Sequence, residues 1–106
     1  MPMIDLQNVR EIQLAGGVSA RVVHTGNVSV ATVDLMAGAV VPEHAHHHEQ
    51  IVSVVDGELE LIVEGSPVPM TPGKVFILPP MTHHSVRALV NSKVVDVFHP
   101  VREDFR

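Results

Sequence analysis

The chain of 106 residues contains no cysteine, tryptophan or tyrosine, and only three phenylalanines. Without cysteine it can form neither a disulfide framework nor a thiolate zinc site. Seven lysines and arginines stand against twelve aspartates and glutamates, a formal net charge of −5 with neutral histidine, and no basic stretch stands out. Because binding to a phosphate backbone needs a positively charged face, we expect no nucleic-acid partner.

Long hydrophobic runs are also absent. No segment approaches the roughly 20 apolar residues of a membrane span. Residues 1–20 include Asp5, Arg10 and Glu11 and lack the apolar run of a signal peptide. We therefore expect a soluble, cytoplasmic protein with no membrane partner. The length matches one domain of about 100–150 residues, so residues 1–106 are predicted to form a single domain.

Apolar residues recur with period two, most cleanly in Glu58–Glu64, where Leu59, Leu61 and Val63 share one face. No segment has a helical stripe. Short valine-rich runs separated by glycine, proline, asparagine and aspartate occur at about residues 19–24, 27–36, 50–56, 74–78, 84–90 and 92–98. Strands at this spacing indicate an all-β sandwich or barrel.

Several glycine and proline pairs predict turns. Asp56-Gly57 lies between two alternating runs and predicts a type I′ hairpin whose strands pair antiparallel. Further turns are expected at Gly26-Asn27, Gly65-Ser66-Pro67 and Pro72-Gly73. Residues 1–17 could add a strand or exchange with a partner subunit.

Histidine is the one residue type in excess. Six of the eight histidines lie in two clusters, at positions 44 to 48 and at His83-His84. In an extended segment the side chains of residues i and i+2 point the same way, so His44 and His46 can bind one metal ion together. Gln50 opens the next run and could add an amide oxygen, and His84 begins a later strand. These groups could converge at the mouth of a barrel.

Spacing alone leaves the ligand set open. The histidine tract could be an accidental surface patch. By counting, His47 and His48 could also be ligands, and Glu49 is a more usual ligand type than Gln50. His24 and His99 are interpreted as structural histidines.

Two spaced motifs resemble those of the cupin superfamily. The first covers Gly38, His44, His46, Gln50 and Gly57, with glutamine where glutamate is usual. The second covers Gly73, Pro79 and His84, with Met81 and Ala88 departing from the usual residues. The resemblance implies a double-stranded β-helix, or jelly-roll barrel.

The same resemblance selects His84 over His83 and Gln50 over Glu49. It implies a divalent metal ion held by His44, His46, Gln50 and His84. Zinc or nickel suits a proton-transfer reaction, with iron or manganese as alternatives for a redox role. Histidine and glutamine ligands do not choose among these metals.

The segment from Asp96 to Phe105 resembles the C-terminal signature of the pectin-degradation cupins of the KdgF type, and the segment from His46 to Ile51 is similar to that group as well. Members of the group convert 4,5-unsaturated uronate monomers into linear 4-deoxy-5-keto sugar acids. The resemblance implies catalytic roles for Asp96, Phe98 and Arg102, an anionic sugar substrate and a homodimer.

These residue types suit that chemistry. Asp96 shares strand parity with Val94 and Phe98, and burial on an apolar face would raise the pKa of its carboxyl, as a proton donor requires. The planar guanidinium of Arg102 can bind a carboxylate through two parallel hydrogen bonds, and Phe98 could line the pocket. Parity does not decide whether Asp96 faces the interior, and Arg102 could instead be a solvated residue that pairs with Asp104.

Two other functions fit the same ligand set. One is a different small-cupin enzyme, a metal-dependent dioxygenase or an isomerase. The other is a non-catalytic sensor or binding module for a small anion or sugar.

Overall fold

The computed structural model describes residues 2–106, which form ten strands and two short 3₁₀ turns. In chain order these are η1 (Leu6–Asn8), β1 (Ile12–Ala15), β2 (Val18–His24), β3 (Ser29–Leu35), β4 (Val40–His44), β5 (Glu49–Asp56), β6 (Leu59–Val63), β7 (Ser66–Met70), β8 (Val75–Leu78), β9 (His84–Ala88), β10 (Ser92–His99) and η2 (Glu103–Phe105). No helix within residues 2–106 has the length and apolar character needed to span a membrane.

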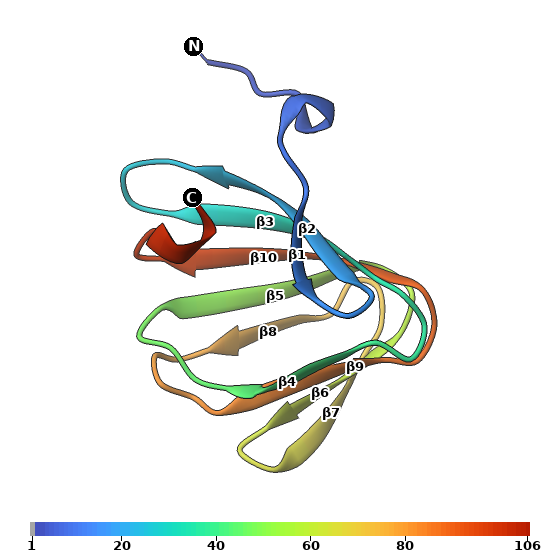
Figure 1. Cartoon of the computed structure of the whole chain (residues 1–106). Helices are drawn as coiled ribbons and strands as arrows, with labels where there is room; N and C mark the ends of the chain where they lie inside the picture. Colours follow the sequence, from blue (N-terminus) through green and yellow to red (C-terminus); the bar gives the residue numbers. More distant parts are fainter. Residues whose placement is uncertain (1) are drawn as a thin grey trace.

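The strands make two antiparallel sheets that face each other (Figure 1). One has the order β1-β2-β3-β10-β5-β8, and the other has the order β4-β9-β6-β7. This is the all-β jelly-roll architecture that the sequence predicted. From β3 onward the chain crosses between the sheets at most connections, and His44 at the end of β4 lies opposite His84 at the start of β9.

The core lies between the sheets and follows the period-two pattern. Alternate residues of β3 are buried, and Leu59 and Leu61 of β6 are 1% and 0% exposed. The predicted inward face of the 58–64 segment is therefore confirmed. Because Gln50 occupies the inward face of β5 together with Val52 and Val54, the same alternation carries a polar side chain into the interior.

The predicted hairpin at Asp56-Gly57 is wrong. Strand β5 pairs with β10 and β8, whereas β6 pairs with β7 and β9, so this turn carries the chain from one sheet to the other. Gly57 has a positive φ of 90°, and a Cβ there would collide with the backbone of Asn91 and Ser92. The Asp-Gly signal marks a tight reversal, and strand pairing was decided by packing against β10.

The hairpin turn of the type expected lies one strand later. Glu64 and Gly65 have φ values of 49° and 80°, and Val63 pairs with Ser66 across them. Ser66 and Pro67, expected in a turn, belong to strand β7. Proline is tolerated there because β7 is the edge of its sheet, where a missing N–H breaks no ladder.

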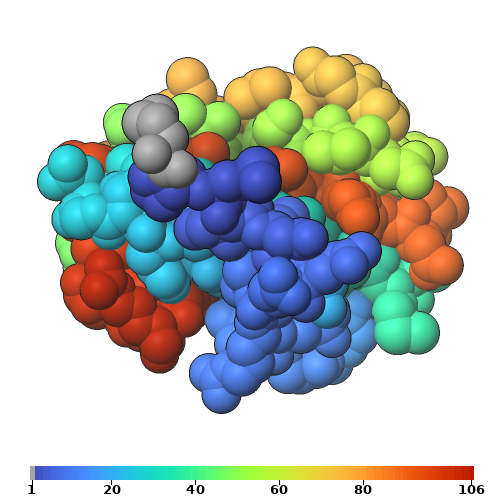
Figure 2. Space-filling view, turned by 90° about the horizontal axis from the view of Figure 1, so that it is seen from above, coloured from blue at the N-terminus to red at the C-terminus, as the bar shows by residue number. Residues whose placement is uncertain are grey.

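The N-terminal residues add strand β1, which pairs with β2 of the same chain. The segment before β1 projects from the sheets in Figure 1 and lies on the outside in the view from above in Figure 2. At the left end of the molecule in Figure 1, the C-terminal turn η2 lies over the ends of β3 and β10, and the loops that follow β4 and β8 lie at the same end below β5. The amide of Met81 donates to the carbonyl of His46 (2.8 Å), which ties these two loops together.

Candidate functional site

A cavity of about 350 Å³ opens between the two sheets. Most of its wall is apolar and comes from the inward faces of both sheets. Its polar wall residues are Glu43, His44, Gln50, His84, Asp96 and Arg102. Five of these six are residues that the sequence analysis proposed for metal binding or catalysis, so the fold brings groups that are far apart in the chain to one hollow.

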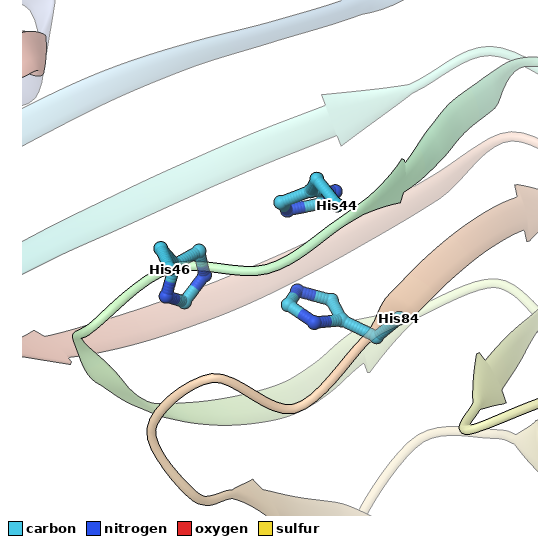
Figure 3. A group of neighbouring side chains, drawn as sticks. All are labelled: His44, His46 and His84. Atoms are coloured by element: carbon cyan, nitrogen blue, oxygen red, sulfur yellow. The ribbon is translucent and has the colours of Figure 1, made fainter.

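Three histidine rings lie close together (Figure 3), and two of them, His44 and His84, line the cavity. His44 ends β4, His46 follows it in the loop, and His84 begins β9, directly opposite His44 in the register. One nitrogen from each ring lies within 4.8 Å of the other two. The i, i+2 argument for His44 and His46 therefore leads to the arrangement expected, with His84 as the third member.

Each of the three rings has one nitrogen fixed by a backbone carbonyl. Nδ1 of His44 contacts the Pro42 carbonyl (2.8 Å), and Nδ1 of His84 contacts the Thr82 carbonyl (2.8 Å). Nδ1 of His46 contacts the carbonyl of His48 (3.1 Å). A carbonyl oxygen can only accept, so each Nδ1 carries the hydrogen, and in the neutral ring each Nε2 presents a lone pair.

These lone pairs have no donor to satisfy them within residues 2–106. Nε2 of His84 is buried without a hydrogen-bond partner. Burial and the charge of Arg102 lower the pKa of His46, and burial lowers the pKa of His84, so both rings are neutral near neutral pH. Neutral imidazoles with converging lone pairs are the ligand form that divalent metals require.

Gln50 completes this cluster. Its Oε1 lies 3.1 Å from Nε2 of His46, so two acceptors face each other. A cation shared between them removes the repulsion, which is how the residues fit a metal ion. The same side chain also lowers the pKa of the Asp96 carboxyl. Glu49, the alternative ligand, is exposed on the opposite face of β5.

Asp96 faces the cavity from β10, which answers the question that strand parity left open. Its Oδ1 is shielded from solvent and has no hydrogen-bond partner, while part of the side chain borders the cavity. Burial raises the pKa of this carboxyl to about 7, against the opposing effects of the Gln50 hydrogen bond and of Arg102.

Arg102 is buried rather than solvated, with a relative exposure of 9%. Its Nε and Nη2 donate to the two carboxylate oxygens of Asp104 at 2.9 and 2.8 Å. The Cζ atom lies 4.7 Å from the ring centre of Phe98 and 4.0 Å from that of Phe105. Phe98 thus lines the cavity and also contacts the Arg102 guanidinium.

The other histidines named in the sequence analysis do not join the triad. His47 and His83 are exposed, and Nδ1 of His83 is 3.9 Å from a Glu43 carboxylate oxygen. His48 is buried beside Phe98, with ring centres 6.3 Å apart. His99 is exposed on β10.

Sequence reasoning took His24 as structural, in agreement with its contact here, but missed Ser29 and Phe105 as supports of the site. His24 bonds the buried hydroxyl of Ser29 (2.7 Å), which also accepts from the Arg102 backbone amide (2.8 Å). Phe105 covers the guanidinium. Its only sequence signal is that it is one of three aromatic residues and lies three positions after Arg102.

Comparison with known proteins identifies the family. The model of the cupin domain matches residues 31–98, which is more than half of the chain. The chain belongs to the cupin family. This cupin is 27% identical over 96 residues to the pectin degradation protein KdgF of Dickeya dadantii (strain 3937), covering 88% of this chain and 87% of that protein.

Solved structures of cupins match more completely. The structure of KdgF from Halomonas sp. is 30% identical, with a TM-score of 0.92 over 100% of this cupin and 99% of that chain. An RmlC-like cupin from Shewanella frigidimarina is 28% identical, with a TM-score of 0.88 over 94% and 91% of the two chains. The resemblance to KdgF therefore extends over nearly the whole chain.

Proposed function

We propose that this cupin opens the ring of 4,5-unsaturated uronate monomers, giving linear 4-deoxy-5-keto uronates, with a divalent metal held by His44, His46, His84 and Gln50. The observation that carries the proposal is that Asp96 and Arg102 line the same cavity as His44 and His84, two members of the histidine triad. The similarity to KdgF, whose name places it in pectin degradation, supports the choice of substrate.

Arg102 supplies the charge that an anionic sugar needs, because the chain as a whole carries a net charge of −5. Its guanidinium binds the uronate carboxylate through paired hydrogen bonds. Phe98 packs against the sugar ring from β10, since apolar surface beside Arg102 suits the ring's hydrophobic face.

Asp96 gives a proton to C4 of the sugar. The C4=C5 electron pair forms the new C4–H bond, and the ring oxygen becomes the C5 ketone as the C1–O5 bond breaks. The hydroxyl on C1 loses its proton to the Asp96 carboxylate and becomes the aldehyde. The reaction is an isomerisation, so it consumes no oxidant, reductant or water, and Asp96 ends as it began.

A divalent ion at the triad, zinc or nickel in this proton-transfer reaction, supplies Lewis-acid polarisation of a substrate oxygen and positive charge for the anionic ligand. The chain's own contribution there is the fixed Nδ1 hydrogen bonds, which keep all three imidazoles in the ligating form.

The test follows the ultraviolet absorbance of a 4,5-unsaturated galacturonate monomer after addition of zinc- or nickel-loaded protein. We expect the absorbance to fall faster with the wild type than in buffer alone. For Asp96→Asn we expect kcat to be at least about 100-fold lower than for wild type. Asp34→Asn is the matched control, because Asp34 is an exposed aspartate on β3 that pairs with Lys93 outside the cavity.

Two outcomes contradict the proposal. If metal-loaded wild type does not exceed the spontaneous rate, this cupin is not a uronate ring-opening enzyme. If it binds the sugar without turning it over, the binding-module interpretation replaces the enzyme. The metal content of both variants is measured as well. It distinguishes activity lost because Asp96 is missing from activity lost because the metal is missing.

A further inference from the structure

Asp104 holds one edge of Arg102, although the proposed reaction assigns Asp104 no role. Its two oxygens accept from Nε and Nη2 of Arg102 at 2.9 and 2.8 Å, a paired geometry. The Arg102 side chain is 11% exposed and that of Asp104 is 56% exposed, so the carboxylate covers the guanidinium on its solvent side. Paired hydrogen bonds between these groups fix orientation as well as distance.

Other groups restrain the rest of Arg102. Phe98 and Phe105 contact the guanidinium on two sides, and their rings are nearly perpendicular at 83°. The backbone amide donates to Ser29, which is fully buried and also bonded to His24. The arginine is therefore anchored at its backbone, at its faces and along one edge.

One edge of the Arg102 guanidinium makes no contact with Asp104. The whole guanidinium carries five N–H groups, and Asp104 accepts from two of them, on Nε and Nη2. Within residues 2–106, Nη1 makes no hydrogen bond, and Arg102 lines the cavity. The remaining N–H groups on Nη1 and Nη2 form an end that matches a second carboxylate in the same paired manner.

We propose that Asp104 is a positioning residue, which sets the rotation of the Arg102 guanidinium so that its Nη1–Nη2 end receives a carboxylate in the cavity. The inference depends on the proposed function only for the identity of that carboxylate as a uronate. The contrary role, in which Asp104 competes for the arginine and must leave before substrate binds, predicts the opposite change in KM.

The first test compares Asp104→Asn, Asp104→Glu and Glu103→Gln as zinc-loaded proteins. Glu103 is a matched control because it belongs to the same turn and its carboxylate lies 3.4 Å from Nε of Arg106. For Asp104→Asn we expect KM for 4,5-unsaturated galacturonate to rise about tenfold, with kcat within about twofold of wild type, because carboxylate binding is lost while Asp96 is untouched. Asp104→Glu should recover part of this loss, and Glu103→Gln should match wild type.

These readouts separate positioning from a structural role. Partial unfolding lowers kcat through a smaller active fraction and leaves KM unchanged, and that result overturns the proposal. A lower KM in Asp104→Asn also overturns it, because it identifies Asp104 as a competing carboxylate.

A second readout needs no substrate. Nuclear magnetic resonance of ¹⁵N-labelled, zinc-loaded protein reports whether the Arg102 side-chain N–H groups rotate and exchange slowly. We expect slow, resolved signals in wild type and Glu103→Gln, and averaged signals in Asp104→Asn. Unchanged Arg102 signals in Asp104→Asn overturn positioning, whereas a wild type that does not turn over the uronate refutes the proposed function and leaves this measurement valid.

Discussion

The amide oxygen of Gln50 lies 3.1 Å from Nε2 of His46, and neither atom has a hydrogen to give to the other. The same side chain lowers the pKa of the Asp96 carboxyl. Gln50 therefore acts on both the histidine triad and the carboxyl on the cavity wall. A glutamate in this position would place a second carboxylate near Asp96.

Replacement of Gln50 should weaken metal binding. Gln50→Leu removes the amide oxygen while keeping similar bulk, and we expect the affinity for zinc to fall by roughly 10- to 100-fold. Calorimetric titration of the metal-free protein measures this change. Glu49→Gln is the control, because that neighbouring side chain points away from the cavity and should leave the affinity unchanged. A larger effect of Glu49→Gln would reverse the ligand assignment.

Metal binding should stabilise the fold through the triad. An ion held only by the folded state at 100 times its Kd adds about 2.7 kcal/mol. For a chain of this size that is a rise in Tm of about 10 °C or more. Differential scanning calorimetry with and without zinc should show the rise in wild type and in His83→Ala, whose ring is exposed, and no rise in His44→Ala. An equal rise in His44→Ala would remove His44 from the ligand set.

The buried carboxyl of Asp96 should make the metal-free protein less stable as pH rises. The pKa of Asp96 is about 7 in the folded chain, whereas the ordinary value of 3.8 applies in the unfolded chain. As the pH rises, the unfolded chain therefore releases this proton at a lower pH than the folded chain does. The contribution of the protonated Asp96 carboxyl to the free energy of unfolding is fully present below pH 3.8. It is lost as the pH rises from there to about pH 7. Asp96→Asn removes the effect and should raise the free energy of unfolding at pH 8 by up to about 4 kcal/mol, with little change at pH 4.

Urea unfolding in the presence of a chelator, at both pH values, measures this difference. Asp34→Asn on the exposed side of β3 keeps Asp96 and should therefore show the same pH dependence as wild type. Equal stability of wild type and Asp96→Asn at pH 8 would show that the carboxyl is solvated in the folded state.

We expect two copies of the chain to associate through the outer face of the six-stranded sheet. Val30, Val97, Ile51 and Ile77 are neighbours in register across β3, β10, β5 and β8, and they form an apolar row without a charge. Ile77 is 62% exposed in the single chain. A self-complementary face of this kind suits a twofold dimer, which buries the row on both subunits.

Light scattering should give about twice the mass of 11.5 kDa for wild type. Ile77→Lys should give the monomer mass with an unchanged circular dichroism spectrum, because a charge in the row cannot be buried unpaired. Val90→Lys, a substitution of an exposed apolar residue in the turn before β10, should remain dimeric. A monomeric wild type would contradict the expectation.

Much of the site follows from short-range sequence pattern. Alternation determines which residues share a face of a strand, so it placed Gln50 with Val52 and Val54, and it paired His44 with His46. The motif spacing then selected His84 over its neighbour. In the structure His44, His46 and His84 form one cluster, and His44, Gln50 and His84 line the cavity.

Long-range contacts decided the rest. Alternation has the same period whichever face is buried, so only the packing of β10 between β3 and β5 placed Asp96 toward the interior. The same packing separated β5 from β6 and made Asp56-Gly57 a link between sheets. The sequence by itself determined most of the strands, which residues share a face of each strand, and the residue types of the metal cluster. Tertiary structure alone decided which strands pair, how deeply Asp96 lies and how Arg102 is held, because each depends on residues distant in the chain that meet only after folding.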